Sequence, residues 1–139
     1  MEIEYDVTGC LAWEECELCL RTYDDCLPEL MAKVSRWGVD RNITEEGGAT
    51  VKAQLDKLVE ELNEGFCTLE AVASTSPTNS LDLEVLHKQL DDDFGDMLVC
   101  LIQAMRLANT DMVTCLEKAW GDIKDRKGTM VDGKFVKES

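Results

Sequence analysis

Two acidic segments of the chain carry the side chains best suited to chemistry. The first, EELNE, includes Glu61 and Glu64, and the second, DDFGD, includes Asp93 and Asp96. Residues three or four positions apart share one face of a helix, so the two members of each pair are expected to project together. Two carboxylates about 5 Å apart repel each other by roughly 3 kcal/mol at an effective dielectric constant near 20. Four of them in one crevice are therefore expected to raise one another's pKa values or to bind cations.

An all-oxygen cluster of this kind suits a hard divalent cation, Mg²⁺ or Mn²⁺, whose shell is completed by water and phosphate oxygens. A second interpretation is a solvated acidic face, the ordinary position of carboxylate pairs in an acidic chain. Both pairs lie within strongly apolar helical segments, and Gly65 and Gly95 accompany them. Because glycine inside a helix costs about 1 kcal/mol relative to alanine, these glycines indicate close helix approach or access by a ligand.

Apolar periodicity predicts the helices that position these pairs. Large apolar residues recur at steps of three or four from Val51 to Leu69, which predicts a helix from Thr50 to the turn-rich stretch 74–80. A second long helix is expected from Ser80, acting as its N-cap, to a break at 109–111. The chain therefore predicts an all-α helical bundle, and antiparallel packing of these two helices would make the carboxylate pairs face each other.

The remaining segments complete a bundle of about four main helices. A helix is expected to enter at Pro28, after a short helix and a break, and to end before a loop at 41–49. A final helix is expected from about Asp111, followed by a basic tail. Residues 1–30 are interpreted as an N-terminal helical extension, and residues 31–139 as the main domain.

Length and charge limit the classes of function. The chain has 139 residues, which is one domain, and a formal net charge of −15. Such a surface repels phosphate backbones and anionic lipids, so no nucleic-acid partner and no membrane partner is expected. The acidic N-terminus lacks the plan of a secretory signal, and the seven cysteines are interpreted as reduced thiols in the cytoplasm.

The acidic segments resemble a known enzyme family. QLDKLVEELNE at 54–64 is similar to the Q-x-x-K-L-x-E-E-x-x-E helix of MazG-like nucleoside triphosphate pyrophosphohydrolases, members of the all-α NTP pyrophosphohydrolase superfamily. DFGDML at 93–98 is similar to that family's E-x-G-D-V-L helix, with Asp93 where the family usually has Glu. EKAW and IKDRKG, from residue 117 to 128, resemble the closing helix and basic tail, and WGVDRNI at 37–43 resembles the stretch before the first motif.

The resemblance implies cleavage of a (d)NTP between its α- and β-phosphates, which gives a (d)NMP and pyrophosphate and serves nucleotide-pool house-cleaning. It implies that Glu61, Glu64, Asp93 and Asp96 hold Mg²⁺, with Mn²⁺ as the other candidate. Glu60, with Glu61, is the candidate for orienting or deprotonating the attacking water. A small bundle with an open crevice is also expected to need a partner surface, so we expect a homodimer or homotetramer.

Five more residues are candidates for binding the triphosphate. Lys57, Lys124 and Arg126 could contact phosphate oxygens. The alternatives are that Lys57 pairs with its neighbouring glutamates and that the other two cations interact with a helix dipole. Gln54 and Trp37 could contact the nucleobase, although an aromatic residue such as Trp37 also serves in a core or an interface.

Two other classes of function compete with the hydrolase. An acidic helical binding protein that mimics nucleic acid would spread its charge over the surface. A carboxylate-bridged di-iron bundle needs Glu-x-x-His pairs, which a single histidine, His87, does not supply. Cys16 and Cys19 form a C-x-x-C pair that could join a zinc site or serve as small apolar packing residues.

Overall fold

The structure is a computed structural model that describes residues 27–139. Helices make up 68% of it, so the expectation of a mostly helical protein is confirmed. The elements are α2 (Leu27–Asp40), α3 (Val51–Ala73), α4 (Ser80–Leu107), α5 (Met112–Ile123), β1 (Gly128–Val131) and β2 (Lys134–Lys137). The helix expected before Pro28 and the Cys16–Cys19 pair lie outside the described residues.

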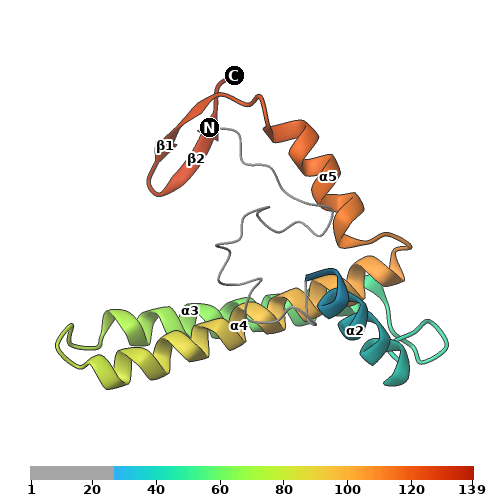
Figure 1. Ribbon diagram of the computed structural model, residues 1–139, viewed down its shortest axis with the longest axis horizontal. Coiled ribbons are helices and arrows are strands. Elements are labelled where there is room, and N and C mark those ends of the chain that lie inside the picture. The colour runs from blue at the N-terminus through green and yellow to red at the C-terminus, as the bar shows by residue number, and fades with distance from the viewer. Residues whose placement is uncertain (1–26) are drawn as a thin grey trace, which may run out of the picture.

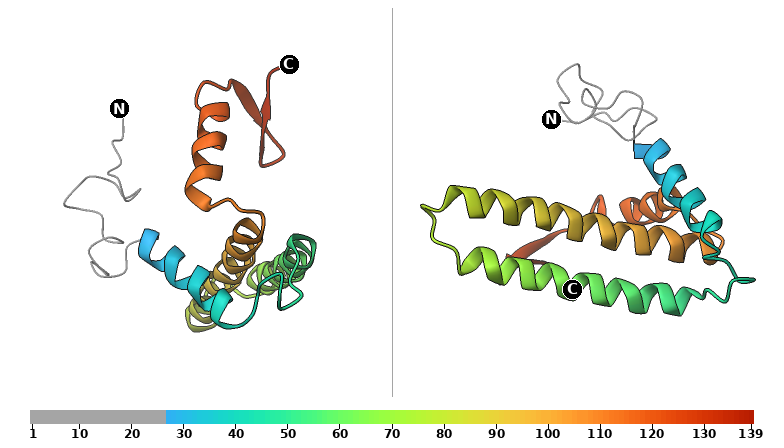
Figure 2. Two further views of the ribbon diagram at one scale, coloured as in Figure 1. Left: turned by 90° about the vertical axis from the view of Figure 1, so that its right-hand side faces the viewer. Right: turned by 90° about the horizontal axis from the view of Figure 1, so that it is seen from below.

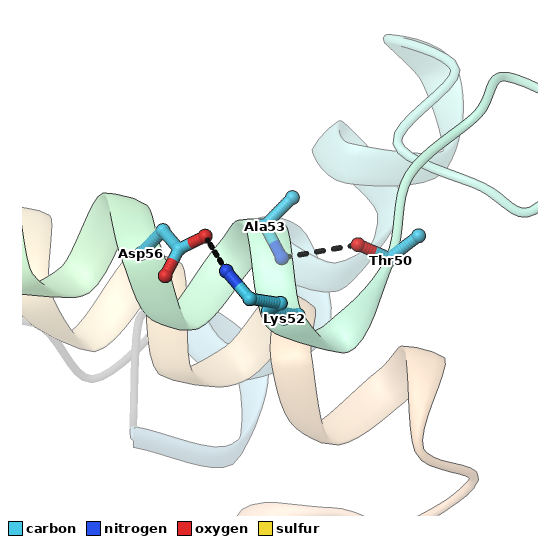
Figure 3. A network of polar contacts seen from close by, with 4 residues as sticks. All are labelled: Thr50, Lys52, Ala53 and Asp56. Carbon is cyan, nitrogen blue, oxygen red and sulfur yellow. Dashed lines mark hydrogen bonds and ion pairs between the residues drawn. The ribbon is translucent and has the colours of Figure 1, made fainter.

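The long helices α3 and α4 form an antiparallel pair joined by a short turn (Figure 1). Thr50 is the N-cap of α3, where its hydroxyl oxygen accepts a hydrogen bond of 3.0 Å from the Ala53 N–H, next to an ion pair of 2.6 Å between Lys52 and Asp56 (Figure 3). The N-cap of α4 is Asn79, whose side chain accepts from the Asp82 N–H, so the expectation that Ser80 takes this position is wrong. Asn79 takes the N-cap position because its side-chain amide oxygen reaches the N–H of the third residue after it.

The faces of α3 and α4 that meet are small and polar at the middle of the pair. Glu61, Gly65 and Thr68 are buried on α3, and Asp93 and Cys100 are buried on α4. Among the described residues, the buried hydrophobic side chains are Cys100, Ile102 and Ala104. The centre of the pair is therefore a polar interface rather than an apolar core.

The two glycines of the acidic segments have different surroundings. A Cβ on Gly65 would lie 2.8 Å from Met97 Cε and 3.9 Å from Asp93 Cβ, so this glycine lets the two helices approach closely. A Cβ on Gly95 would meet nothing within 4 Å. Close helix approach is therefore confirmed at Gly65, whereas Gly95 borders open space.

Seven large apolar side chains of α3 and α4 are exposed along one side of the pair. Each of these seven comes one residue after a residue that faces the partner helix, and a helix turns about 100° per residue. Because the two helices run antiparallel, this same sense of rotation places both sets on one side of the pair. We call this side the apolar stripe: Leu55, Val59, Leu62, Phe66 and Leu69 of α3, with Phe94 and Leu98 of α4.

The opposite side of the pair is acidic. Glu60 and Glu64 precede the inward residues of α3 by one position, and Asp92 and Asp96 do the same on α4. By the same helical geometry, all four exposed carboxylates lie on the side opposite the apolar stripe. We call this side the acidic flank.

Helix α2 packs against the C-terminal half of α4 (Figure 2). Gln103, only 1% exposed, donates a hydrogen bond of 2.8 Å to the Val34 carbonyl. Arg106 donates to the Gln103 side-chain oxygen and to the Ile43 carbonyl. A Cβ on Gly38 would lie 1.9 Å from that same amide oxygen, so α2 can approach only with glycine at this position. Position 103 comes one residue before a residue that faces α3, so Gln103 lies on the acidic flank. Because α2 packs on Gln103, α2 forms the boundary of the acidic flank at this end.

The basic tail forms a β-hairpin, which the sequence analysis did not anticipate. β1 and β2 pair antiparallel, and Asp132 and Gly133 both have positive φ values in the turn between them. Helix α5 begins at the predicted place, capped by Asp111, whose carboxylate accepts a hydrogen bond of 2.8 Å from the Thr114 N–H. Together α5 and the hairpin lie away from the α3–α4 pair, and we call them the arm (Figure 1).

Candidate functional site

Glu61 lies between α3 and α4 with 7% of its surface exposed. Its carboxylate forms an ion pair of 2.8 Å with Lys57, one turn earlier on α3. Lys57 also lies 3.0 Å from Glu60, and these two carboxylates raise the pKa of the lysine. The alternative in which Lys57 pairs with its neighbouring glutamates is therefore the arrangement found, and one ammonium group serves two carboxylates.

Asp93 faces α3 from the middle of α4 and is 2% exposed. Thr68 of α3 donates a hydrogen bond of 2.5 Å to one of its oxygens, and Gln89, one turn earlier on α4, donates 3.0 Å to the other. Burying a carboxylate is costly unless its oxygens accept hydrogen bonds. These two donors therefore hold the Asp93 side chain in a fixed orientation between the helices.

Asp96 lies on the acidic flank, close to both buried carboxylates. Desolvation raises the pKa of Asp96, and the negative charges of Glu61, Asp92 and Asp93 raise it further. Burial, and then the charge of Glu61, likewise raises the pKa of the Cys100 thiol. Like charges that raise a carboxyl pKa indicate an excess of negative charge at one place.

The structure brings the two sequence-predicted pairs into one region, although not as four equivalent ligands. Glu61 and Asp93 are buried between the helices, whereas Glu64 and Asp96 are exposed on the acidic flank. Within residues 27–139, no group of three or more His, Cys, Asp or Glu side chains is already gathered closely enough to hold a metal ion. A metal would therefore require these side chains to move by rotamer changes, and the two exposed ones are free of packing that would prevent it.

The chemistry of the donors fits a hard divalent cation. All four predicted ligands offer carboxylate oxygens, the donors that Mg²⁺ and Mn²⁺ prefer. The Lys57 ammonium group already supplies a positive charge beside Glu61. Because Lys57 is 49% exposed at its side chain, it can swing away and leave Glu61 to a stronger cation.

The candidate substrate-binding residues are distributed over three parts of the molecule. Gln54 is half-buried on α3, two helical turns before Glu61. Trp37 is 43% exposed on α2, and the guanidinium group of Arg41 stacks 5.5 Å from its ring. Lys124 and Arg126 are exposed on the arm, whereas the four predicted metal ligands lie on the α3–α4 pair.

The sequence analysis missed the polar residues that support the site. Thr68 lies seven residues after Glu61, so the inward face of α3 could have identified it from helical spacing alone. Gln89 lies four residues before Asp93 and could have been found in the same way. Gln103 has no such local signal, because its partner is the carbonyl of Val34, far away in the sequence.

Comparisons with family models, curated proteins and solved structures give no match to this chain. In the part of the chain that the structure describes, no helix has the length and apolar character needed to cross a membrane. The function therefore has to be argued from the geometry of the carboxylates at the α3–α4 interface.

Proposed function

We propose that the chain is a metal-dependent nucleoside triphosphate pyrophosphohydrolase that converts a (d)NTP to a (d)NMP and pyrophosphate in the cytoplasm. The observation that carries the proposal is the concentration of negative charge around Glu61 and Asp93. Glu61 and Asp93 are buried on facing helices, and desolvation, followed by the charges of Glu61, Asp92 and Asp93, raises the pKa of Asp96 beside them. A protein that needs only a solvated acidic surface gains nothing from burying two of its carboxylates.

Each of the acidic residues has a distinct part in this proposal. Glu61 and Asp93 would be the fixed members of the ligand set, and the exposed Glu64 and Asp96 would complete it from the acidic flank. Bound Mg²⁺ or Mn²⁺ supplies neutralisation of phosphate oxygens and lowers the pKa of the attacking water. Glu60 accepts a proton from that water as the water attacks a phosphorus atom of the triphosphate. The bond between this phosphorus and the α–β bridging oxygen then breaks.

The cation of Lys57 takes two positions in this account. Without substrate it pairs with Glu60 and Glu61. With a divalent cation bound to Glu61, the ammonium group of Lys57 would be available to contact a phosphate oxygen. Positioning and electrostatic stabilisation are the main tasks of an enzyme in phosphoryl transfer, and a lysine on the same face as the ligands serves both.

We further propose that the working form is a homodimer or a larger homo-oligomer. The apolar stripe exposes seven large hydrophobic side chains on one side of two packed helices. An exposed apolar face of this kind marks a protein–protein interface. A second α3–α4 pair on the stripe would complete a four-helix bundle, and both acidic flanks would lie on the outer sides of that bundle.

Pyrophosphate release from a panel of NTPs and dNTPs with Mg²⁺ tests the proposed reaction. The wild-type protein is expected to release pyrophosphate and a monophosphate, and EDTA is expected to stop the reaction. Glu64→Ala and Asp96→Ala are expected to lower kcat by at least about 100-fold, since each loses a metal ligand. Glu70→Ala, an exposed glutamate elsewhere on α3, is the matched control and should retain wild-type turnover. Turnover that survives in the first two variants would overturn the assignment of the site.

The acidic binding protein remains the competing function, and the exposed residues of the acidic flank are the observation that favours it. Such a protein would bind a basic partner tightly, and increasing salt would weaken the complex. It would also bind that partner equally well with and without divalent metal. Absence of pyrophosphate release from every triphosphate, together with metal-independent binding to a basic protein, would replace the hydrolase by this alternative.

A further inference from the structure

The arm has an apolar surface that is exposed among residues 27–139. On α5 the exposed hydrophobic residues recur at steps of three and four, and Trp120 and Leu116 expose 62% and 59% of their surface. On the hairpin, Met130 and Phe135 pair across the strands and are 66% and 52% exposed. A helix of 12 residues and an isolated two-stranded hairpin are both marginally stable in water. The arm therefore needs a surface to pack on.

The described part of its own chain does not supply that surface. Extensive packing between elements occurs for α3 with α4, α2 with α4 and β1 with β2, and α5 takes part in none of it. In the short link between α4 and α5, Asn109 has a φ of 58° and Asp111 caps α5. The arm is thus directed away from the α3–α4 pair to which it is joined (Figure 2).

The acidic flank of α4 offers a surface of complementary chemistry. Leu81 and Val85, which are 75% and 66% exposed, share this face of α4 with Asp92 and Asp96, because all four recur at helical spacing. On this face of α4 apolar residues are followed by acidic ones. On the arm, in the same way, the apolar residues of α5 are followed by the basic residues Lys124 and Arg126. α5 spans about 18 Å, and the stretch of α4 from Val85 to Asp96 spans about 16 Å, so one arm matches both the apolar and the acidic part.

We propose that the arm of one copy docks on the acidic flank of a second copy and places Lys124 and Arg126 beside that copy's carboxylate cleft. This inference rests on the proposed function, and it names which cations bind the triphosphate and from which subunit they come. The apolar residues of α5 pack on Leu81 and Val85 of the second copy. Each cleft then combines acidic metal ligands from one chain with phosphate-binding cations from the other.

Mixing two defective variants tests whether the cations act on the other subunit. Lys124→Ala/Arg126→Ala is expected to raise the KM for the triphosphate by about tenfold or more with little change in kcat, since it loses charge-assisted phosphate contacts. Glu61→Gln is expected to lose turnover. Refolded together and assayed well below KM, the two variants should form hybrid dimers in which one cleft has both wild-type parts. About a quarter of the wild-type activity should return for random pairing in a symmetric dimer.

The matched control mixes Glu61→Gln with Asp93→Asn, whose defects lie in the same cleft and cannot complement each other. Activity that returns in the first mixture and not in the second supports the arm of the second copy. A wild-type enzyme that is active while the first mixture stays inactive would overturn the inference and leave the proposed function intact.

Self-association gives a readout that does not depend on activity. Trp120→Glu and Val85→Asp change opposite sides of the same proposed contact, and each should raise the dimer dissociation constant at least about tenfold in sedimentation equilibrium. Glu117→Gln, on the polar face of α5, should leave that constant unchanged. If no triphosphate is cleaved, the proposed function fails and with it the role of the two cations, and these dissociation constants alone decide the docking. An unchanged constant in both variants overturns the docking.

Discussion

The hydroxyl of Thr68 donates a hydrogen bond of 2.5 Å to the buried carboxylate of Asp93, and this contact joins α3 to α4 at the centre of the molecule. It is a polar contact at a position where two packed helices usually place apolar side chains. Thr68 also donates to the Glu64 carbonyl on its own helix. The threonine therefore fixes the carboxylate relative to the backbone that carries the first acidic segment.

Thr68→Val should destabilise the fold, because it keeps the shape and leaves a buried carboxylate without one of its donors. We expect a loss of about 1–3 kcal/mol in the free energy of unfolding, measured by urea denaturation. Thr68→Ser retains the hydroxyl and is the matched control, with a much smaller loss. A valine variant as stable as the wild type would mean that the hydrogen bond contributes nothing to the α3–α4 interface.

Asp96→Asn should stabilise the metal-free protein while it removes a metal ligand. The folded state raises the pKa of Asp96 above its ordinary value of 3.8, so ionising this group costs folding stability. That cost is absent below the ordinary pKa and increases as the pH rises through the raised pKa. The variant should therefore have a higher melting temperature than the wild type at neutral pH in EDTA.

The pH dependence of this gain provides the check. The difference in melting temperature between Asp96→Asn and the wild type should vanish as the pH falls towards the ordinary aspartate pKa. Glu70→Gln removes a charge from an exposed position elsewhere on α3 and should show no such trend. A variant that is less stable than the wild type at neutral pH would contradict the concentration of negative charge around Asp96.

The packing of α2 against α4 should not tolerate a side chain at position 38. A Cβ there would lie 1.9 Å from the amide oxygen of Gln103, whose other contacts hold it in place. Gly38→Ala is expected to lower the free energy of unfolding by about 1–3 kcal/mol, as overpacking does. Gly95→Ala is the control, because open space surrounds it, and it should raise helix stability by up to about 1 kcal/mol. Equal effects of the two substitutions, measured by thermal unfolding, would contradict this packing.

The apolar stripe should hold two copies of the chain together. Phe66→Asp places a charge at the middle of the stripe and should convert the wild-type oligomer to a monomer in analytical ultracentrifugation. Ala53→Asp adds the same charge to an exposed position on the opposite side of α3 and should leave the assembly unchanged. A wild-type protein that sediments as a monomer at micromolar concentration would contradict the expected oligomer.

The helices could be predicted from sequence because their ends carry local signals. Thr50 and Asp111 accept hydrogen bonds from N–H groups three residues later, and such caps are visible in any sequence. The hairpin also has a clear local signal in the sequence, but its residues were interpreted as part of a basic tail. Asp132-Gly133 between two apolar pairs is a strong two-residue turn signal, because both central residues can take a positive φ.

The orientation of α3 could not be obtained from periodicity alone. Its large apolar residues form a stripe at helical spacing, and such a stripe normally faces the core. In the structure the neighbouring face, with Glu61 and Thr68, packs against α4, and the stripe stays exposed. A helical period gives the width of an apolar face, whereas the partner that covers this face depends on contacts outside the helix.

Binding of Mn²⁺ tests the central claim most directly, because it reports on the carboxylate cleft without requiring turnover. Electron paramagnetic resonance would follow the free Mn²⁺ signal as protein is added in the presence of a non-hydrolysable α,β-methylene dNTP. The wild-type protein is expected to remove the free Mn²⁺ signal in a saturable way, whereas Glu61→Gln and Asp93→Asn leave it unchanged. A wild-type protein that does not reduce the signal, or variants that reduce it equally well, would contradict metal binding between α3 and α4.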